Sequence, residues 1–283
     1  MRVRREKGTS RLRRRVRKRR LAALLLVLFV AAALSFTFGL IRAVASEVPA
    51  LDPAAQHSDV DTVVYASNGR TVLAVLRGNE SRVLVGTDDI APIMRQAIVS
   101  VEDQRFFEHN GIDVKGVARA LWEDVRQQGI VEGGSTITQQ FVKNAYIRNE
   151  RTLARKVREA ALAWQLEQRW SKDRILTAYL NTIYFGHGAY GIQQAARAYF
   201  KRSAKNLTLA ESALLAGIPS DPSLYDPAVN PRSATLRRRH VLELMLQQRK
   251  ITWRQYKRAD KAPLPDPDEI RLPGTEGPAP YFV

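Results

Sequence analysis

An uncharged run of 21 residues, Leu21–Ile41, constrains the organisation of this chain more than any other stretch. As a helix it would span about 31 Å, close to the hydrocarbon thickness of a bilayer. A buried helix would normally carry a polar stripe, whereas this run has only Ser35 and Thr37. We therefore expect a transmembrane signal-anchor helix over residues 21–44. A cleaved signal peptide is the alternative, because Ala43–Ala45 resembles a cleavage site, although the run is long for one.

Positive charge is concentrated before this run. The net charge of the chain is +17, and residues 1–20 carry +11 of it, with Glu6 as their one acid. Basic residues beside a membrane span stay in the cytoplasm, so we expect a basic cytoplasmic tail over residues 1–20 and an extracytoplasmic chain beyond about residue 45. A nucleic-acid-binding arm is the alternative, but a tail against a span is better explained as a topology signal that also favours anionic lipid. The basic residues are Arg2, Arg4, Arg5, Lys7, Arg11, Arg13, Arg14, Arg15, Arg17, Lys18, Arg19 and Arg20.

Composition excludes several kinds of site and marks the ends of a folded domain. The chain has no cysteine, which excludes disulfides and cysteine-ligated metals, and its four histidines form no His-x-x-x-His pair. Residues 45–60, with Pro49 and Pro53, suit a linker. Residues 261–283 hold six of the thirteen prolines and suit a second linker or a truncated end. The folded domain is therefore expected over residues 61–260.

The residue pattern predicts that this domain is mainly α with one small β hairpin. Two β-branched runs, 62–65 and 71–76, flank Asn68-Gly69, which is a strong hairpin signal. Beyond Val85 the apolar spacing is helical. The helix boundaries are indicated by three capping boxes, a proline start and a glycine-proline stop: Thr136 with Gln139, Thr208 with Glu211, Thr252 with Gln255, Asn230-Pro231, and Gly217 with Pro219.

Residues 102–113 form the first candidate catalytic stretch. The apolar residues before them have helical spacing, so we expect Glu102 at a helix end, with Phe106 one turn further and Gly111 in a turn. A carboxylate beside apolar and aromatic groups loses solvation, which raises its pKa and suits proton transfer near neutral pH. The alternative is a solvated acidic helix end, which describes Glu102 and Asp103 better when they are taken alone.

Two further stretches carry groups that bind anions. Gly133-Gly134 leads into a capped helix start, whose free N–H groups suit a phosphate or pyrophosphate, and Lys143 follows two turns on. Arg155 and Glu159 have i,i+4 spacing. They form either a surface ion pair or, with Lys156, a cationic face able to hold a diphosphate and a divalent cation. For the glycines the alternative is an ordinary hinge.

Residues 172–191 predict a helix followed by a glycine-rich turn, with Tyr179, Tyr184 and Phe185 in the core. The turn fits Gly-x-Gly-x-x-Gly, but a dinucleotide fingerprint follows a strand and this one follows a helix, so we reject it. Asp266–Asp268 resembles an Asp-x-Asp metal motif, but it lies in the proline-rich end.

Together, the order and spacing of five motifs resemble glycosyltransferase family 51, the peptidoglycan transglycosylase module of class A penicillin-binding proteins and of monofunctional transglycosylases. The resemblance runs from about Asp61 to Pro227. It implies a lysozyme-like, mostly helical fold with a cleft between a large lobe and a membrane-facing jaw lobe. The motifs are Glu-Asp-x-x-Phe-x-x-His-x-Gly at 102–111, Gly-Gly-Ser-Thr-Ile-Thr-Gln-Gln at 133–140, Arg-Lys-x-x-Glu at 155–159, Ile-Leu-x-x-Tyr-Leu-Asn at 175–181 and Leu-Ala-Glu-Ser-Ala-Leu-Leu-Ala-Gly at 209–217.

The resemblance also implies a reaction. A glycan chain on undecaprenyl pyrophosphate would be transferred to lipid II, with Glu102 as the general base that deprotonates the acceptor's 4-hydroxyl. The hydroxyl would attack the anomeric carbon with inversion and form a β-1,4 bond. Glu159 would stabilise the leaving pyrophosphate together with a divalent cation, Mg or Mn, and would act as a metal ligand through the pyrophosphate. The implied substrate-binding residues are Asp103, Phe106, Ser135, Gln139, Lys143, Arg155, Lys156 and Asn181.

The implied setting is a bacterial cell membrane crossed once, with the catalytic domain on the extracytoplasmic side. Other proteins of cell-wall synthesis or division are expected partners, and nucleic acid is not. Bifunctional members continue into a transpeptidase domain marked by Ser-x-x-Lys, Ser-x-Asn and Lys-Thr-Gly. No serine here has a lysine three residues on, and Lys-Thr-Gly is absent. Both a truncated bifunctional protein and a short monofunctional one therefore stay open.

Two other functions compete with the polymerase. A lysozyme-like peptidoglycan cleaver also uses one glutamate, but its leaving group is a sugar hydroxyl and needs no cationic face of the kind formed by Lys143, Arg155 and Lys156. A membrane-anchored scaffold would keep the fold without activity, whereas every acid and base of the motifs is present in this chain.

Overall fold

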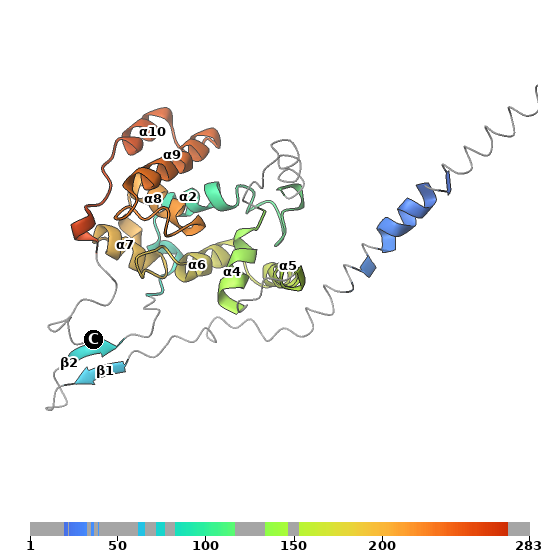
Figure 1. The fold of residues 1–283 in the computed structure, drawn as a ribbon, viewed down its shortest axis with the longest axis horizontal. Helices are drawn as coiled ribbons and strands as arrows, with labels where there is room; N and C mark the ends of the chain where they lie inside the picture. Colours follow the sequence, from blue (N-terminus) through green and yellow to red (C-terminus); the bar gives the residue numbers. More distant parts are fainter. Residues whose placement is uncertain are drawn as a thin grey trace, which may run out of the picture. The chain divides into compact units, whose positions relative to one another are not determined.

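The computed structural model divides the chain into two compact units, Met1–Pro49 and Ala50–Val283 (Figure 1). Described residues between 20 and 39 are helical in the first unit, and Leu26 and Phe29 there are exposed. Within the described part of the chain, no helix has both the length and the apolar character needed to cross a membrane. The transmembrane helix therefore stays a prediction, and the linker over residues 45–60 lies outside the described residues. The structure describes residues 20–21, 23–32, 35–36, 39, 62–65, 72–76, 83–116, 134–146 and 153–270.

The predicted β hairpin is confirmed. Strand β1 (Thr62–Tyr65) pairs antiparallel with β2 (Val72–Leu76), in a register that places Thr62 opposite Leu76. The register shifts between Val64 and Tyr65. The expected Asn68-Gly69 turn lies outside the described residues.

One group of helices contains the end of α2 (Pro92–Glu102), where the first candidate catalytic residue lies. Helix α2 starts with proline at its first position and buries Met94, Ala97 and Ile98. It packs against α8 (Leu209–Gly217) and α9 (Pro231–Gln247), and α10 (Trp253–Asp260) packs on α9. Helix α8 is buried from Ser212 to Gly217 and packs on both α2 and α9, so it forms the centre of this group.

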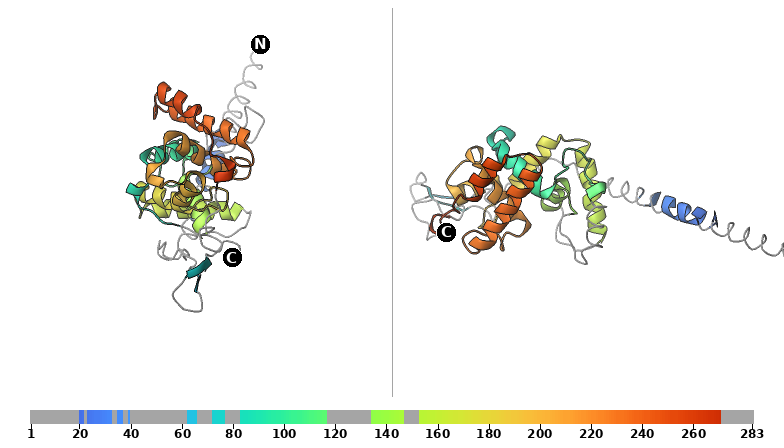
Figure 2. Two further views of the ribbon diagram at one scale, coloured as in Figure 1. Left: turned by 90° about the vertical axis from the view of Figure 1, so that its left-hand side faces the viewer. Right: turned by 90° about the horizontal axis from the view of Figure 1, so that it is seen from above.

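A second group is formed by α4 (Ile137–Tyr146), α5 (Leu153–Glu167), α6 (Lys172–Thr182) and α7 (Ile192–Phe200). Helix α4 packs on both α5 and α6, and its Phe141 is fully buried. In Figure 1 helices α4, α5 and α6 of this group lie on a different side of the helical body from the orange-to-red helices α9 and α10, and Figure 2 gives two further views. Short 3₁₀ turns are η2 (Thr87–Asp89), η3 (Ala204–Asn206), η4 (Ile218–Ser220) and η5 (Pro267–Glu269).

The local helix signals are confirmed with one difference. All three capping boxes form, and α8 ends at Gly217 as predicted. Asn230 stands at the N-cap of α9, but its side chain makes no capping bond and instead donates to the carbonyl of Ser223. The glycines of residues 186–191 form a turn after α6, closed by a bridge between Tyr184 and Tyr190, so this sequence follows a helix, as predicted. Tyr184 is exposed, so its prediction as a core residue is wrong.

The domain is therefore mainly helical, as predicted, and α9 also fixes its C-terminal segment. Arg238 is buried and donates to the carbonyls of Asp260, Ala262 and Pro263. Arg239 pairs with the Asp260 side chain at 2.9 Å. The lysozyme-like architecture and the jaw lobe stay predictions.

Candidate active site

A pocket of about 540 Å³ lies where the two helix groups meet. Its walls come from the end of α2, from the first turns of α4, from α5, and from η4 with α9. Six of the ten predicted site residues line it, although they lie far apart in the sequence. The lining residues are Val101, Glu102, Gly134, Ser135, Gln139, Gln140, Lys143, Lys156, Glu159, Pro219, Ser220, Arg237 and His240.

Glu102 is the last residue of α2 and faces this pocket. Its Oε2 accepts a hydrogen bond of 2.7 Å from Nε2 of Gln140 on α4. Burial raises the pKa of the Glu102 carboxyl, against lowering effects of the Gln140 hydrogen bond and the Arg237 charge, while nearby Asp103 raises it further. A carboxylate with a raised pKa, a fixed orientation and access to a pocket has the properties of a general base.

Arg237 and His240 on α9 are lining residues that the sequence analysis missed. The Arg237 guanidinium lies 5.2 Å from the Tyr225 ring, and its Nε donates to the Gly217 carbonyl at 3.2 Å. A side-chain Cβ at position 217 would lie 2.7 Å from Cγ of Arg237. Burial lowers the pKa of His240, and Arg237 lowers it further, whereas Glu243 raises it. The glycine that ends α8 was predicted as a helix stop, but nothing in its local sequence indicated the arginine.

The cationic part of the pocket is organised around Glu159. This carboxylate is 1% exposed and pairs with Nε of Arg155 at 3.1 Å and with Nζ of Lys156 at 2.9 Å. Lys156 also donates to Oγ of Ser135 at 3.1 Å, which joins α5 to the glycine-rich start of α4. Lys143 lines the same pocket and is exposed. Lys143 and Lys156 therefore line one pocket, and Arg155 and Glu159 form the ion pair that their spacing allowed. The diphosphate-binding face stays a prediction.

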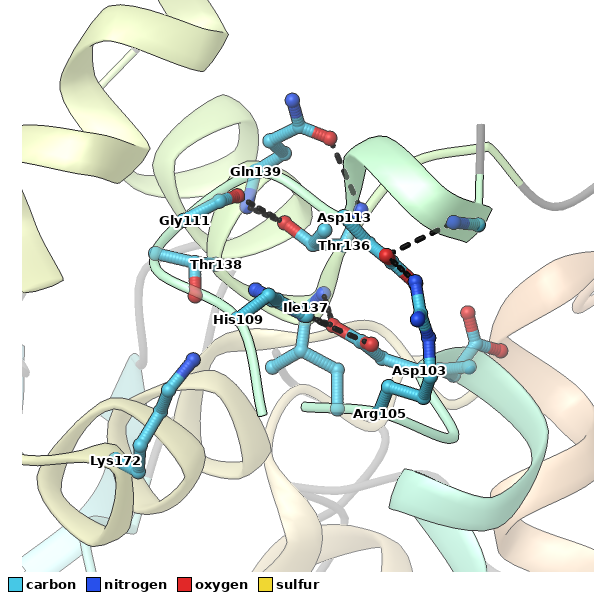
Figure 3. Close-up of polar contacts among 12 residues, drawn as sticks. Asp103, Arg105, His109, Gly111, Asp113, Thr136, Ile137, Thr138, Gln139 and Lys172 are labelled. Carbon is cyan, nitrogen blue, oxygen red and sulfur yellow. Dashed lines mark hydrogen bonds and ion pairs between the residues drawn. The ribbon is translucent and has the colours of Figure 1, made fainter. Parts of the chain in front are cut away.

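The residue after the candidate base is a buried connector. Asp103 is 7% exposed, and its carboxylate oxygens lie 2.9 and 3.0 Å from Nε2 of His109. The backbone N–H of Ile137 donates to the same carboxylate at 3.1 Å (Figure 3). Asp103 thus attaches the end of α2 to the first turn of α4. This position favours a supporting role over direct substrate contact, and the predicted contact stays a prediction.

Gly111 lies in the turn that follows α2. Its φ is +78°, and an added Cβ would lie 2.6 Å from the backbone nitrogen of Trp164 on α5. Its carbonyl accepts from Oγ1 of Thr136 at 2.7 Å (Figure 3). Gln139 accepts from the Thr136 backbone through Oε1 at 3.0 Å, so one end of this predicted substrate ligand is used in the helix cap. The turn predicted at Gly111 is confirmed.

Two more predicted ligands are not among the residues that line the pocket. Phe106 is fully buried, and Nζ of Lys172 lies 4.4 Å from its ring centre while pairing with Glu167 at 2.7 Å. Asn181 uses its side-chain amide to bind both the N–H and the carbonyl of Val85, at 3.2 and 2.9 Å. Neither side chain lines the pocket. Both positions favour supporting roles over the predicted direct contact, which stays a prediction.

A model of the transglycosylase family matches residues 68–246. Penicillin-binding protein 1A of Neisseria flavescens is 42% identical over 219 residues, which cover 77% of this chain and 27% of the relative. Penicillin-binding protein 2D of Bacillus subtilis (strain 168) is 43% identical over 221 residues, covering 78% of this chain and 32% of the relative. A crystal structure of penicillin-binding protein 1A from Haemophilus influenzae has a TM-score of 0.43 and 23% identity, covering 74% of this chain and 21% of that one.

The chain therefore belongs to the transglycosylase family, the glycosyltransferase family 51 domain of class A penicillin-binding proteins. By class it is a peptidoglycan glycosyltransferase. It spans about a quarter to a third of the length of these relatives.

Proposed function

We propose that this protein polymerises lipid II into β-1,4-linked glycan strands and releases undecaprenyl pyrophosphate. The observation that carries the proposal is one pocket lined by a half-buried carboxylate with a raised pKa, Glu102, and by cationic side chains on other helices. Glycosyl transfer from a diphosphate needs both parts: a base for the acceptor hydroxyl and positive charge for the leaving group. A hydrolase acting on a sugar leaving group would instead protonate the leaving oxygen with a carboxylic acid and would need no cationic cluster.

In the proposed reaction, Glu102 accepts the proton of the acceptor's 4-hydroxyl as that oxygen attacks the anomeric carbon. The bond from this carbon to the pyrophosphate breaks, and the pyrophosphate departs with the electron pair, so the configuration inverts. The hydrogen bond from Gln140 holds the carboxylate in place during the attack. The raised pKa of Glu102 makes it a stronger proton acceptor than an exposed glutamate.

The departing pyrophosphate is assigned to Lys143, Lys156 and Ser135, which line the pocket. Arg155 acts through Glu159, because the two form an ion pair and Arg155 does not itself line the pocket. Glu159 is nearly inaccessible and holds Arg155 and Lys156 at fixed positions. Its proposed catalytic contribution is therefore to orient positive charge toward the leaving group.

The described residues do not fit a dedicated metal site. They contain no group of three or more His, Cys, Asp or Glu side chains placed to hold a metal ion. The Glu159 carboxylate is engaged by two cationic side chains, which compete with a metal for the same oxygens. A divalent cation stays in the proposal only as a companion of the substrate's diphosphate oxygens, and no step is assigned to it.

We further propose that the chain crosses the bacterial cell membrane once, with residues 1–20 in the cytoplasm and the enzyme domain outside. The basic tail and the uncharged run support this topology, as do the exposed apolar side chains of the described helical residues, such as Phe29. Lipid II is a membrane lipid, so an anchor beside the domain places enzyme and substrate at one surface. Other cell-wall synthesis or division proteins are proposed partners.

The deciding experiment incubates the purified full chain, in detergent, with labelled lipid II and a divalent cation. Glycan polymer should form with the wild type and be nearly absent with Glu102→Gln. Glu108→Gln is the matched control, because Glu108 is exposed and lies outside the pocket. Cleavage of preformed peptidoglycan without polymer formation would establish the hydrolase instead, and inactivity in both assays would favour the scaffold.

A further inference from the structure

The side chain that binds the candidate base Glu102, Gln140, is itself bound by a third residue, Tyr179. Gln140 on α4 donates from Nε2 to Glu102 at 2.7 Å, and its Oε1 accepts from the Tyr179 hydroxyl at 3.0 Å. Tyr179 lies on α6, is fully buried and does not line the pocket. Three residues on three helices therefore form a chain of hydrogen bonds whose last member lies away from any substrate.

The orientation of the Gln140 amide decides which form of Glu102 it stabilises. With Nε2 toward Glu102, the amide donates to the ionised carboxylate; with Oε1 toward Glu102, it repels the carboxylate and accepts from the neutral acid. Rotating the amide by half a turn exchanges these two states. Something must fix the orientation if Glu102 is to work as a base.

Tyr179 supplies that constraint. Burial raises the pKa of Tyr179 well above its ordinary value, so the hydroxyl keeps its proton. Among the described contacts, the acceptor for this proton is Oε1 of Gln140. In the rotated amide the buried proton would face an N–H group and lose its acceptor, which is unfavourable for a buried donor.

We propose that Tyr179 is a positioning residue for Glu102, because its hydroxyl fixes the Gln140 amide with the N–H end toward the base. Its effect on rate rests on the proposed function, whereas the orientation itself does not. The described contacts give a hydrogen bond to Oε2 of Glu102 and none to Oε1, which leaves Oε1 for the acceptor hydroxyl.

Charged and titratable groups around Glu102 stay unchanged when the hydroxyl of Tyr179 is removed. Asp103, the next residue in the chain, raises the pKa of Glu102, and Arg237 on α9 lowers it. The other groups of the pocket walls are Lys143 on α4, Lys156 and Glu159 on α5, and His240 on α9. A Tyr179→Phe substitution therefore tests orientation without altering a charge.

The first measurement is the titration midpoint of Glu102 in the full chain, followed by NMR of ¹³C-labelled glutamate carboxyls and assigned with Glu102→Gln. Tyr179→Phe should raise this midpoint by roughly half to one pH unit, the size of one neutral hydrogen bond. The acidic limb of the polymerisation rate should shift in the same direction. Above both midpoints kcat should recover, whereas general structural damage would lower it at every pH.

A double-mutant cycle separates the effect of Tyr179 that passes through the Gln140 amide from an effect on packing. In a Gln140→Met background the amide is gone, so Tyr179→Phe should cause no further shift. Replacing Tyr179 with 4-aminophenylalanine keeps an N–H donor at the same place and should restore the wild-type midpoint. Tyr199→Phe is the matched control, because Tyr199 is also buried and loses one bond, to the carbonyl of Phe185, away from the pocket.

Each outcome decides the proposal. An unchanged Glu102 midpoint in Tyr179→Phe, or a shift that persists with Gln140→Met, would overturn it. If Tyr179→Phe does not fold, wild-type NOEs still decide: the Nε2 protons of Gln140 should contact the Glu102 side chain, and contact with the Tyr179 ring alone would refute the orientation. If the wild type does not polymerise lipid II, the proposed function fails. The titration midpoint of Glu102 measured by NMR still tests whether Tyr179 positions Glu102 through Gln140.

Discussion

The backbone N–H of Ile137 donates a 3.1 Å hydrogen bond to the buried carboxylate of Asp103. This contact attaches the residue next to the candidate base to the first turn of α4, the helix that carries Gln140 and Lys143. The base and part of the anion site are therefore held in one frame rather than on independent loops.

Asp103→Ala should destabilise the fold and slow catalysis together. The substitution leaves the N–H of Ile137 and the ring of His109 without their buried acceptor, and a hydrogen bond to a charged group is typically worth about 1.5–3 kcal/mol. Chemical denaturation measures the loss. Asp173→Ala is the control, because its partner Arg95 binds it at an exposed position where an ion pair contributes about 0–1 kcal/mol. Equal losses in the two variants would contradict the connector role.

Glu102→Gln should abolish polymerisation without lowering stability at neutral pH. General-base assistance is typically worth about 10²–10⁴-fold in rate. Because burial raises the folded-state pKa of Glu102, the folded protein binds this proton more tightly than the unfolded chain, and stability falls as pH rises through that range. Glutamine removes the ionisation, so the variant should be at least as stable as the wild type at pH 7. Thermal unfolding checks this, and a large drop would make Glu102 a structural residue.

The wild-type rate should rise with pH on its acidic side, since only the ionised form of Glu102 accepts a proton. The raised pKa places this limb above the ordinary range of a glutamate. A rate profile measured with lipid II between mildly acidic and neutral pH would show the limb. A flat profile would remove Glu102 as the titrating base.

Lys143→Ala and Arg155→Ala should each slow turnover while the protein stays folded. For Lys143, which lines the pocket, one charged hydrogen bond to the anion is worth about 1.5–3 kcal/mol, or roughly tenfold or more in rate if it acts in the transition state. Arg155 acts on the rate through its ion pair with Glu159. Arg155→Ala should also cost some stability, because Glu159 is 1% exposed and loses a partner. Arg158→Ala serves as the control on an exposed position of α5. Wild-type rates in both Lys143→Ala and Arg155→Ala would remove the anion-site assignment.

Topology can be tested cleanly because the chain has no cysteine of its own. A cysteine at Lys7 should be shielded from an impermeant thiol reagent in intact cells, and a cysteine at Asn79 should be labelled. Labelling at position 7 alone would reverse the proposed orientation.

Local signals predicted much of this fold. The end of α2 at Glu102, the three capping boxes and the turn at Gly111 follow from spacing and from residue types with few backbone options. The hydrogen bond from Gln140 to Glu102 joins residues 38 positions apart, and Arg237 reaches the pocket from a helix near the other end of the domain. Neither contact leaves a periodic trace in the sequence, because each depends on how whole helices pack.

Some residues of the sequence motifs do not line the pocket. Asn181 belongs to a motif, yet its amide binds the backbone of Val85, 96 residues away. Tyr179 was predicted as core, and it is buried, but its hydroxyl points at the amide that holds the base. A motif lists residues that a site requires without separating those that face the substrate from those that support them.

The absence of a side chain at Gly217 affects the position of Arg237, and through it the pKa of Glu102. The space that its missing side chain leaves is filled by the stem of Arg237, whose Cγ would lie 2.7 Å from any Cβ there. A larger residue at position 217 would displace the cation that lowers the pKa of Glu102. Positions 217 and 237 should consequently change together as related sequences diverge, and a chain that exchanged only one of them would work in a different acidity range.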